Sequence, residues 1–288
     1  MKKTLFQAIT LLLFLNSGLL CKAQDDSIPI KSSHGEAKIS YASNSVYLGR
    51  KDSLPIHYIT PQFGFYDRSG LFINGSFSYL SSTTESQVDV FTIEAGYQYQ
   101  LNDHWDGSFS FEKYFYNSTS HSVKSEVSGV FTAGINYSSD VLNTFGSLNL
   151  NFGAKTDYGF NAGLSHSFNI GEQFTLEPQA SLNAATQNFY KAYYEKRRYS
   201  AKRKTPNTNI TVSITSDVGQ LKILDYEFAL PVHYKVRNFE FFLEPTLALP
   251  VNPNTVNLKI NNFQKTFQEK FSSTAFFELG FSYKIGRS

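Results

Sequence analysis

The sequence alternates between apolar and polar residues over segments longer than the strands of most soluble proteins. In residues 274–285, Ala, Phe, Leu, Phe, Tyr and Ile occupy the odd positions, whereas Glu278, Ser282 and Lys284 stand at even positions. Successive side chains of a strand point to opposite faces, so this pattern predicts a strand with one apolar and one mainly polar face. Strands in soluble proteins usually have about five or six residues, whereas a membrane-crossing strand needs about 9–11. The length therefore favours a membrane strand.

About twelve segments share this pattern, and the first is the faintest: 37–48, 54–66, 71–81, 88–101, 105–116, 123–137, 141–153, 158–169, 173–186, 221–236, 238–251 and 273–286. Short turns are expected at 67–70, 102–103, 138–140, 171–172 and 237–238, and longer links at 82–87, 117–122, 187–220 and 252–272. Short turns on one side and long loops on the other are typical of outer-membrane barrels. An even strand count places both ends of the barrel on the short-turn side, which is expected to be periplasmic.

The N-terminal segment has the features of a secretory signal peptide. Basic residues at positions 2 and 3 precede a mostly apolar stretch, 5–20, and cleavage is expected after Ala23. The alternatives are a membrane anchor, although the apolar stretch is shorter than the ~20 residues of a spanning helix, and lipidation at Cys21. We therefore expect a signal peptide at 1–23, a flexible segment at 24–36 and a barrel at 37–288.

Composition excludes several classes of protein. No second long apolar run follows the signal, which argues against a helical membrane protein. Cys21 is the one cysteine, so a disulfide scaffold is excluded. Removing residues 1–23 leaves 26 − 3 = 23 basic against 24 acidic side chains, a balance of −1, which does not call for a nucleic-acid partner. Aromatic residues make up 16% of the chain, which suits strands better than helices.

At the level of pattern, residues 37–288 resemble a bacterial outer-membrane β-barrel of the small, roughly twelve-stranded kind. Phe277, Phe281 and Tyr283 fit the alternating aromatics of the last strand in such barrels, although residues 286–288 extend beyond the usual terminal aromatic. The resemblance implies an all-β, closed, antiparallel up-and-down barrel in the bacterial outer membrane. It also implies contact with outer-membrane lipid and lipopolysaccharide, and allows a protein partner in the membrane. The competing fold is a soluble β-sandwich or lipocalin-like barrel.

Four prolines lie inside expected strands: Pro61, Pro178, Pro231 and Pro245. A proline removes one hydrogen bond from a ladder, and a closed barrel has no edge strand to accommodate it. We expect β-bulges at these positions. A bulge would exchange the inward and outward faces beyond it.

Ionisable residues are expected on the inward face. The lumen-lining candidates are Glu94, Glu112, Glu177, Asp225, Glu227, His233, Lys235, Glu240, Glu244 and Glu278. If residues 237–238 form a two-residue turn, Lys235 and Glu240 face each other as a cross-strand ion pair, and Glu244 faces Pro231. One interpretation is a set of polar side chains that satisfy one another and fill the barrel. The other is a narrow pore or small-ligand site. No metal site and no cofactor are predicted.

The 187–220 loop has a concentration of basic residues, interleaved with tyrosines. The candidates for contact with a surface ligand are Lys196, Arg197, Arg198, Lys202, Arg203 and Lys204. On the expected topology this loop is extracellular, where such residues suit lipopolysaccharide phosphates and the membrane boundary. The alternative is a solvated loop with no ligand.

No catalytic residue is predicted. A lipase-type site needs a serine activated by a histidine, and no histidine here has a serine two residues on within a strand. His166 is followed by Ser167 on the opposite face. Three functions remain open: a porin-like barrel for small-solute uptake or a structural role, a scaffold subunit of an outer-membrane secretion or assembly complex, and a lipid-active enzyme.

Overall fold

Twelve antiparallel strands close into a barrel in a computed structural model, which describes residues 32–51, 56–81, 86–120, 122–195, 210–260 and 263–286. The barrel strands are β1 (His34–Ala42), β4 (His57–Tyr66), β5 (Leu71–Ser81), β6 (Ser86–Gln100), β7 (Trp105–Tyr116), β8 (Gly129–Tyr137), β9 (Asn143–Phe152), β10 (Asp157–Ser165) continued by β11 (Phe168–Ile170), β12 (Phe174–Leu176) continued by β13 (Gln179–Ala185), β15 (Lys222–Ala229) continued by β16 (Val232–Val236), β17 (Phe239–Pro250) and β20 (Thr274–Ile285).

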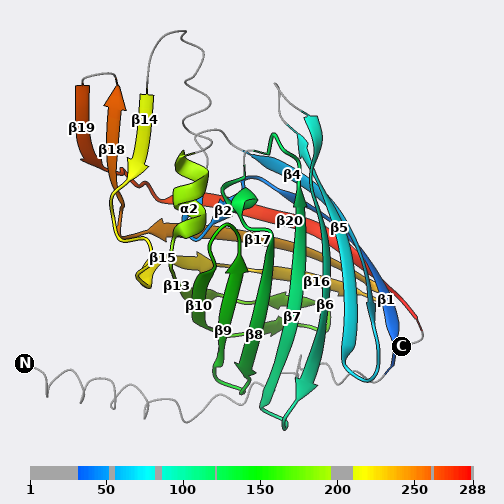
Figure 1. The fold of residues 1–288 in the computed structure, drawn as a ribbon. Helices are drawn as coiled ribbons and strands as arrows, with labels where there is room; N and C mark the ends of the chain where they lie inside the picture. The colour runs from blue at the N-terminus through cyan, green and yellow to red at the C-terminus, as the bar shows by residue number, and fades with distance from the viewer. Residues whose placement is uncertain are drawn as a thin grey trace, which may run out of the picture.

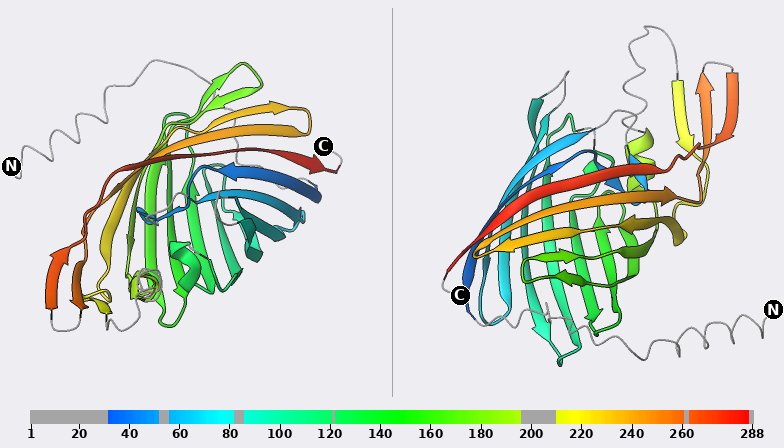
Figure 2. Two further views of the ribbon diagram at one scale, coloured as in Figure 1. Left: turned by 90° about the horizontal axis from the view of Figure 1, so that it is seen from above. Right: turned by 180° about the vertical axis from the view of Figure 1, so that it is seen from behind.

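The first and last strands pair with each other and complete the ring. Gly35 of β1 lies opposite Ile285 of β20, and β20 in turn pairs along its length with β17 (Figures 1 and 2). Closure leaves no unpaired sheet edge, so the backbone polar groups of the wall can be satisfied without water. Both ends of the barrel chain lie at the end with the short turns, as an even strand count requires.

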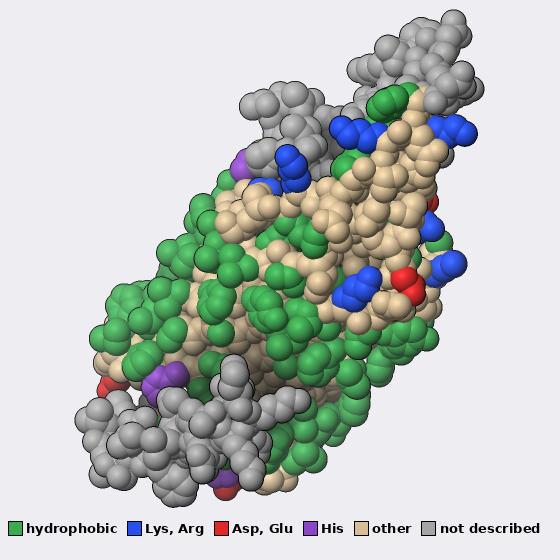
Figure 3. Space-filling view, turned by 90° about the vertical axis from the view of Figure 1, so that its left-hand side faces the viewer, with side chains coloured by type: hydrophobic (Ala, Val, Ile, Leu, Met, Phe, Trp, Pro, Cys, Tyr) green, Lys and Arg blue, Asp and Glu red, His purple; other side chains and the backbone are tan. Residues whose placement is uncertain are grey.

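The outer face of the wall is apolar. In β20 the odd-numbered side chains are exposed, with Phe281 at 43% and Leu279 at 42%, while the even-numbered ones face inward. Aromatic side chains of neighbouring strands stack on this outer face, as Phe77, Phe91 and Phe115 do with ring centroids 4.9 and 5.7 Å apart. Figure 3 shows hydrophobic side chains spread over the wall on one face. An apolar surface of this extent is favourable in contact with lipid and unfavourable in contact with water. It confirms the membrane barrel and its outer-membrane location.

The expectation of bulges at the four prolines is wrong. The register is the same on both sides of Pro178 and of Pro231, where the strands are only interrupted, and β4 and β17 run through Pro61 and Pro245. The carbonyls of two of these prolines still accept hydrogen bonds across the wall: Glu177 N donates to Pro231 O over 2.9 Å and Leu230 N to Pro245 O over 3.0 Å. The inward and outward faces therefore continue unchanged past the prolines.

Two register shifts occur elsewhere. Asp89 is the extra residue where β6 pairs with β5, and Leu224 is the extra residue where β15 pairs with β13. Both side chains are fully buried, at 0% exposure. Neither position carries the proline or glycine signal that a sequence offers for a bulge.

The first strand begins and ends earlier than the expected segment 37–48. Residues 46–51 instead form a small hairpin, β2 (Val46–Tyr47) and β3 (Arg50–Lys51), whose turn residues Leu48 and Gly49 have φ of 49° and 70°. Two positive φ values are what the commonest two-residue hairpin turn requires. A Cβ on Gly49 would come within 2.7 Å of Asp225 Cβ, so the hairpin packs closely against the barrel wall.

Other links at the long-loop end also carry structure. The 3-10 helix η1 (Val123–Glu126) precedes β8, and helix α2 (Asn188–Tyr193) follows β13. Strands β14 (Ile210–Ile214), β18 (Thr255–Ile260) and β19 (Phe263–Gln268) form a second sheet that projects beyond the barrel (Figure 1). Within the described residues, no helix is long and apolar enough to cross a membrane.

Candidate functional site

A packed cluster lies against the inner wall at the long-loop end of the barrel; we call it the plug and define it as η1, α2 and the β2–β3 hairpin. Phe189 and Tyr193 of α2 and Val123 of η1 are at most 3% exposed and pack against inward-facing Val90 and Tyr114 of the wall. Figure 1 shows α2 and η1 side by side at this end. Apolar side chains on the inner wall are thus covered by loops folded inward, and the cluster is the main hydrophobic core of the molecule.

One carboxylate of the wall holds the start of α2. Asp157, the first residue of β10, is 1% exposed. Its oxygens accept hydrogen bonds from Asn188 N at 2.8 Å, Asn188 Nδ2 at 3.0 Å and Phe189 N at 2.7 Å, and from the Thr186 hydroxyl. The first backbone N–H groups of a helix have no partner within it, and a negative charge there is favourable. Asp157 therefore anchors the plug to the barrel.

A polar network joins the plug to the lumen beneath it. Lys124 of η1 donates to the Tyr114 hydroxyl, which donates to Glu112 of the wall. The Lys124 ammonium also lies over the rings of Tyr114 and Tyr47, at 4.1 and 5.3 Å from their centroids. Burial lowers the pKa of Lys124, and the charges of Glu112 and Glu94 oppose that shift. The Tyr47 hydroxyl donates to Asn151 Oδ1 at 2.9 Å, so the hairpin is tied to the wall as well.

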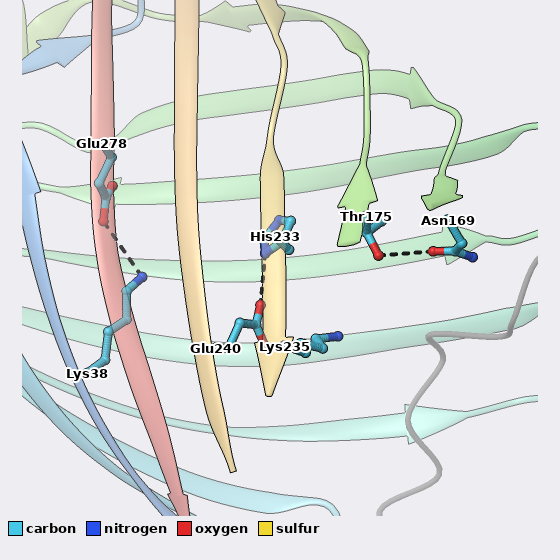
Figure 4. Close-up of polar contacts among 7 residues, drawn as sticks. All are labelled: Lys38, Asn169, Thr175, His233, Lys235, Glu240 and Glu278. Carbon is cyan, nitrogen blue, oxygen red and sulfur yellow. Dashed lines mark hydrogen bonds and ion pairs between the residues drawn. The ribbon is translucent and has the colours of Figure 1, made fainter. Parts of the chain in front are cut away.

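Towards the short-turn end the inward face carries paired charges (Figure 4). The predicted cross-strand pair is confirmed: Lys235 lies opposite Glu240, with 3.9 Å between Nζ and Oε2. Glu240 makes a shorter contact with His233, whose Nδ1 is 2.8 Å from Oε1. A further ion pair joins Lys38 and Glu278, with 3.6 Å between Nζ and Oε1. Lys38 was not among the residues predicted from the sequence.

The remaining lumen candidates are spread along the wall rather than gathered at one point. Glu94 accepts from Asn74 Nδ2 at 3.1 Å, and Glu177 accepts from the Ser165 hydroxyl at 2.5 Å. Asp225 and Glu227 stand two residues apart on β15, with Asp225 fully buried opposite Asn183. Glu244 lies opposite Glu278, and the unchanged register also places it beside Pro231, as predicted. Glu94 and Glu177 thus have polar partners on the inner wall, as expected of side chains that satisfy one another.

Neither His166 nor His233 contacts a hydroxyl that it could activate, among the hydrogen bonds of the described residues. The Nδ1 atom of His166 lies 2.7 Å from Val141 O, and its ring packs edge-on against Phe168. His233 contacts Glu240, while Thr175, opposite it in register, donates to Asn169 (Figure 4). No group of three or more metal-ligating side chains occurs in the part of the chain that the structure describes. The six basic loop candidates, from Lys196 to Lys204, lie outside the described residues.

Sequence reasoning missed the plug and the residues that hold it. Tyr47 lay within a segment interpreted as strand, and Asp157 stood at a strand boundary. The available signal was the faintness of the first segment together with Leu48–Gly49, since a Gly at a turn breaks a period of two. The clustered tyrosines of 190–194 were interpreted as part of a surface loop, whereas the described ones are buried.

Comparisons with known proteins give similarity of shape alone. No family model matches the sequence, and no curated protein matches it. Among solved structures, the chain is similar to the KdgM porin (10% identity, 88% of this chain and 99% of that chain, TM-score 0.47) and to the NanC porin (13%, 87% and 100%, TM-score 0.48). It is also similar to LpxR from Salmonella typhimurium (8%, 86% and 99%, TM-score 0.45). At these values the likeness assigns no residue of this chain a role.

Proposed function

We propose that the chain is a porin-like outer-membrane protein that passes small polar solutes through a lumen normally closed at its long-loop end. The observation that carries the proposal is the pairing of a polar inner wall with a plug made of inward-folded links. A barrel that only stabilised the membrane would need neither a hydrated inner wall nor a removable closure. The short-turn end, with both barrel termini, would face the periplasm.

The plug is built in a way that allows it to open. The barrel wall is held by its own closed ladder of backbone hydrogen bonds, whereas the plug is held by side-chain packing and by a few anchors such as Asp157. Elements that make few backbone hydrogen bonds to the rest of the protein open at a lower free energy than the strands against which they pack. The wild-type protein should therefore conduct in rare events of small amplitude.

The experiment combines conductance in planar bilayers with cysteine modification. Thr132 of β8 faces the lumen, where its hydroxyl donates to Asn149 Oδ1 at 2.9 Å, and its neighbour Phe131 faces lipid. A bulky, charged thiol reagent should reduce the conductance of Thr132→Cys and leave that of Phe131→Cys unchanged. The wild-type chain, whose one cysteine is Cys21, is the reagent control. A folded barrel that shows no current at any voltage would overturn the proposal.

We also propose that the protein performs no covalent chemistry. This is supported by the contacts of His166 with a backbone carbonyl and of His233 with a carboxylate, neither of which activates a hydroxyl. Phospholipid or lipopolysaccharide turnover that disappears in His166→Ala or His233→Ala would contradict it.

A scaffold role is the second candidate, favoured by the projecting sheet. Every residue of its edge strand β19 is exposed, including Phe263 at 60%, and an exposed strand edge can accept a strand from a partner. A stoichiometric partner that co-purifies with the wild type, and is lost when residues 255–268 are replaced by a short turn, would favour this role over conduction.

A further inference from the structure

A pocket of about 610 Å³ lies between the plug and the β18–β19 hairpin. The plug contributes residues of the β2–β3 hairpin and of α2 to its lining. Its size lies within the ~300–1,000 Å³ of typical small-molecule sites. The charged lining residues are Arg50, Lys51, Lys265, Lys270 and Glu269, and the aromatic ones are Tyr190, Tyr194, Phe267 and Phe271. Four cations against one acid give a local balance of +3. Figure 3 likewise shows Lys and Arg side chains towards this end of the molecule, away from the apolar wall.

Arg50 forms the floor of this pocket. It is 2% exposed, and its Cζ lies 5.1 Å from the ring centroid of Tyr190 and 5.0 Å from that of Phe271. Both rings line the pocket, so the guanidinium is held between two of its walls. A guanidinium over an aromatic face is attracted by the ring, and this interaction does not use its N–H donors.

The guanidinium has unused donors. Nη1 donates to Leu48 O at 3.1 Å, whereas Nε and Nη2 have no hydrogen-bond partner among the described residues. Burial lowers the pKa of Arg50, yet an arginine in a protein stays protonated. A buried charge with unsatisfied donors is costly, and an oxyanion would relieve that cost.

Two acids lie near the guanidinium, since the charges of Glu269 and Asp225 oppose the lowering of the Arg50 pKa by burial, but neither forms an ion pair with Arg50 within 4.0 Å. Glu269 already accepts from the Tyr190 hydroxyl at 2.8 Å and from Asn254 N at 3.3 Å. Asp225 packs closely against Gly49, the neighbour of Arg50, and its side chain makes no ion pair with Arg50 within 4.0 Å. Above the floor, Lys265 and Lys270 are exposed at the rim, where they would meet an incoming anion first.

We propose that this pocket binds a phosphate-bearing ligand, with the phosphate on Arg50 and the rim lysines and the rest of the ligand against the aromatic walls. A phosphate monoester carries close to two negative charges, which suits a balance of +3 better than a single carboxylate does, and its oxygens match the arginine fork. The ligand could be a soluble sugar phosphate or the phosphorylated sugar of a lipid headgroup. The site does not depend on whether the lumen conducts.

The test is calorimetric titration of the purified full-length protein in detergent with glucose 6-phosphate, with glucose and citrate as controls. We expect glucose 6-phosphate to bind and the two controls to bind at least tenfold more weakly. Arg50→Gln should weaken binding at least tenfold. The double variant Lys265→Gln/Lys270→Gln, altered only at exposed positions, should weaken it several-fold. Lys155→Gln, an exposed lysine of another link at the same end, is the matched control and should bind as the wild type does.

Heat-modifiable migration on a gel establishes that each variant is folded, and the double lysine variant keeps the test valid if Arg50→Gln does not fold. Lipopolysaccharide is titrated in parallel: binding of lipopolysaccharide without glucose 6-phosphate identifies the headgroup as the ligand, and the reverse identifies a soluble ester. The proposal is overturned if folded wild type binds neither, if citrate binds as tightly as the phosphate ester, or if the double lysine variant binds unchanged.

Discussion

Replacing Asp157 with alanine should release the plug while leaving the barrel intact. The substitution removes the acceptor for Asn188 N and Phe189 N and for two side-chain donors, all in a site that is 1% exposed. Each buried donor left without a partner costs about 1–3 kcal/mol, so the two backbone donors alone give about 4 kcal/mol. At about 1.4 kcal/mol per factor of ten, the open plug becomes roughly a thousandfold more populated. The wall loses none of its backbone ladder, so the effect should remain local.

Two assays follow this release. Hydrogen exchange of the backbone amides of 188–193 should accelerate by two to three orders of magnitude, while those of β6 and β7 stay protected. The frequency of channel openings in planar bilayers should rise in parallel. The matched control is Asp106→Ala, where one exposed hydrogen bond from Asn136 at 2.7 Å is lost at the opposite end. If Asp157→Ala leaves both exchange at 188–193 and opening frequency at wild-type values, the plug is not anchored as described.

Further predictions concern the wall and a turn. Leu148→Lys places a charge at a lipid-facing position of β9 that is 62% exposed, and should cost about 2–4 kcal/mol of folding free energy in bilayers. The neighbouring lumen-facing change Asn149→Lys should cost about 1 kcal/mol or less, as measured by urea titration of folding into vesicles; equal costs would contradict the assignment of faces. Hydrogen bonds from Ser69 and Ser33 lower the pKa of Asp67 to about 2. The bonds that join this turn to Ser33 should therefore be intact above pH ~4, the unfolded value, and weaken as the pH falls towards 2. Asp67→Asn should remove this pH dependence of amide exchange at Arg68 and Ser69, and an unchanged profile would refute it.

Most of the barrel could be predicted from period and length alone. In a strand with one face against lipid and the other against water, every second residue must be apolar. The alternation in β20 and β6 can therefore be recognised from the sequence alone. The pairing of Lys235 with Glu240 followed from a two-residue turn, because register is fixed once the turn is known. The bulges predicted at the prolines are absent because a ladder can omit one hydrogen bond and keep its register when the pairs on both sides of the proline stay in place.

The plug could not be predicted in the same way. Its residues come from three separate links, and their burial depends on contacts between segments distant in sequence, such as Tyr47 with Phe189 at a centroid distance of 5.1 Å. Arg50 had no local signal either, since its pocket is assembled from β3, α2 and the β18–β19 hairpin. The local periodicity of a sequence indicates which face of a strand a residue occupies. It does not indicate which distant segment of the chain packs over that residue.

The most direct test of the central claim is the rate at which a membrane-impermeant thiol reagent modifies Thr132→Cys from each side of a bilayer. A lumen that is open at the short-turn end and closed by the plug at the other predicts fast modification from the short-turn side and slow modification from the long-loop side. Equal rates from both sides would show that no plug closes the lumen, and no modification from either side would show that Thr132 does not line one.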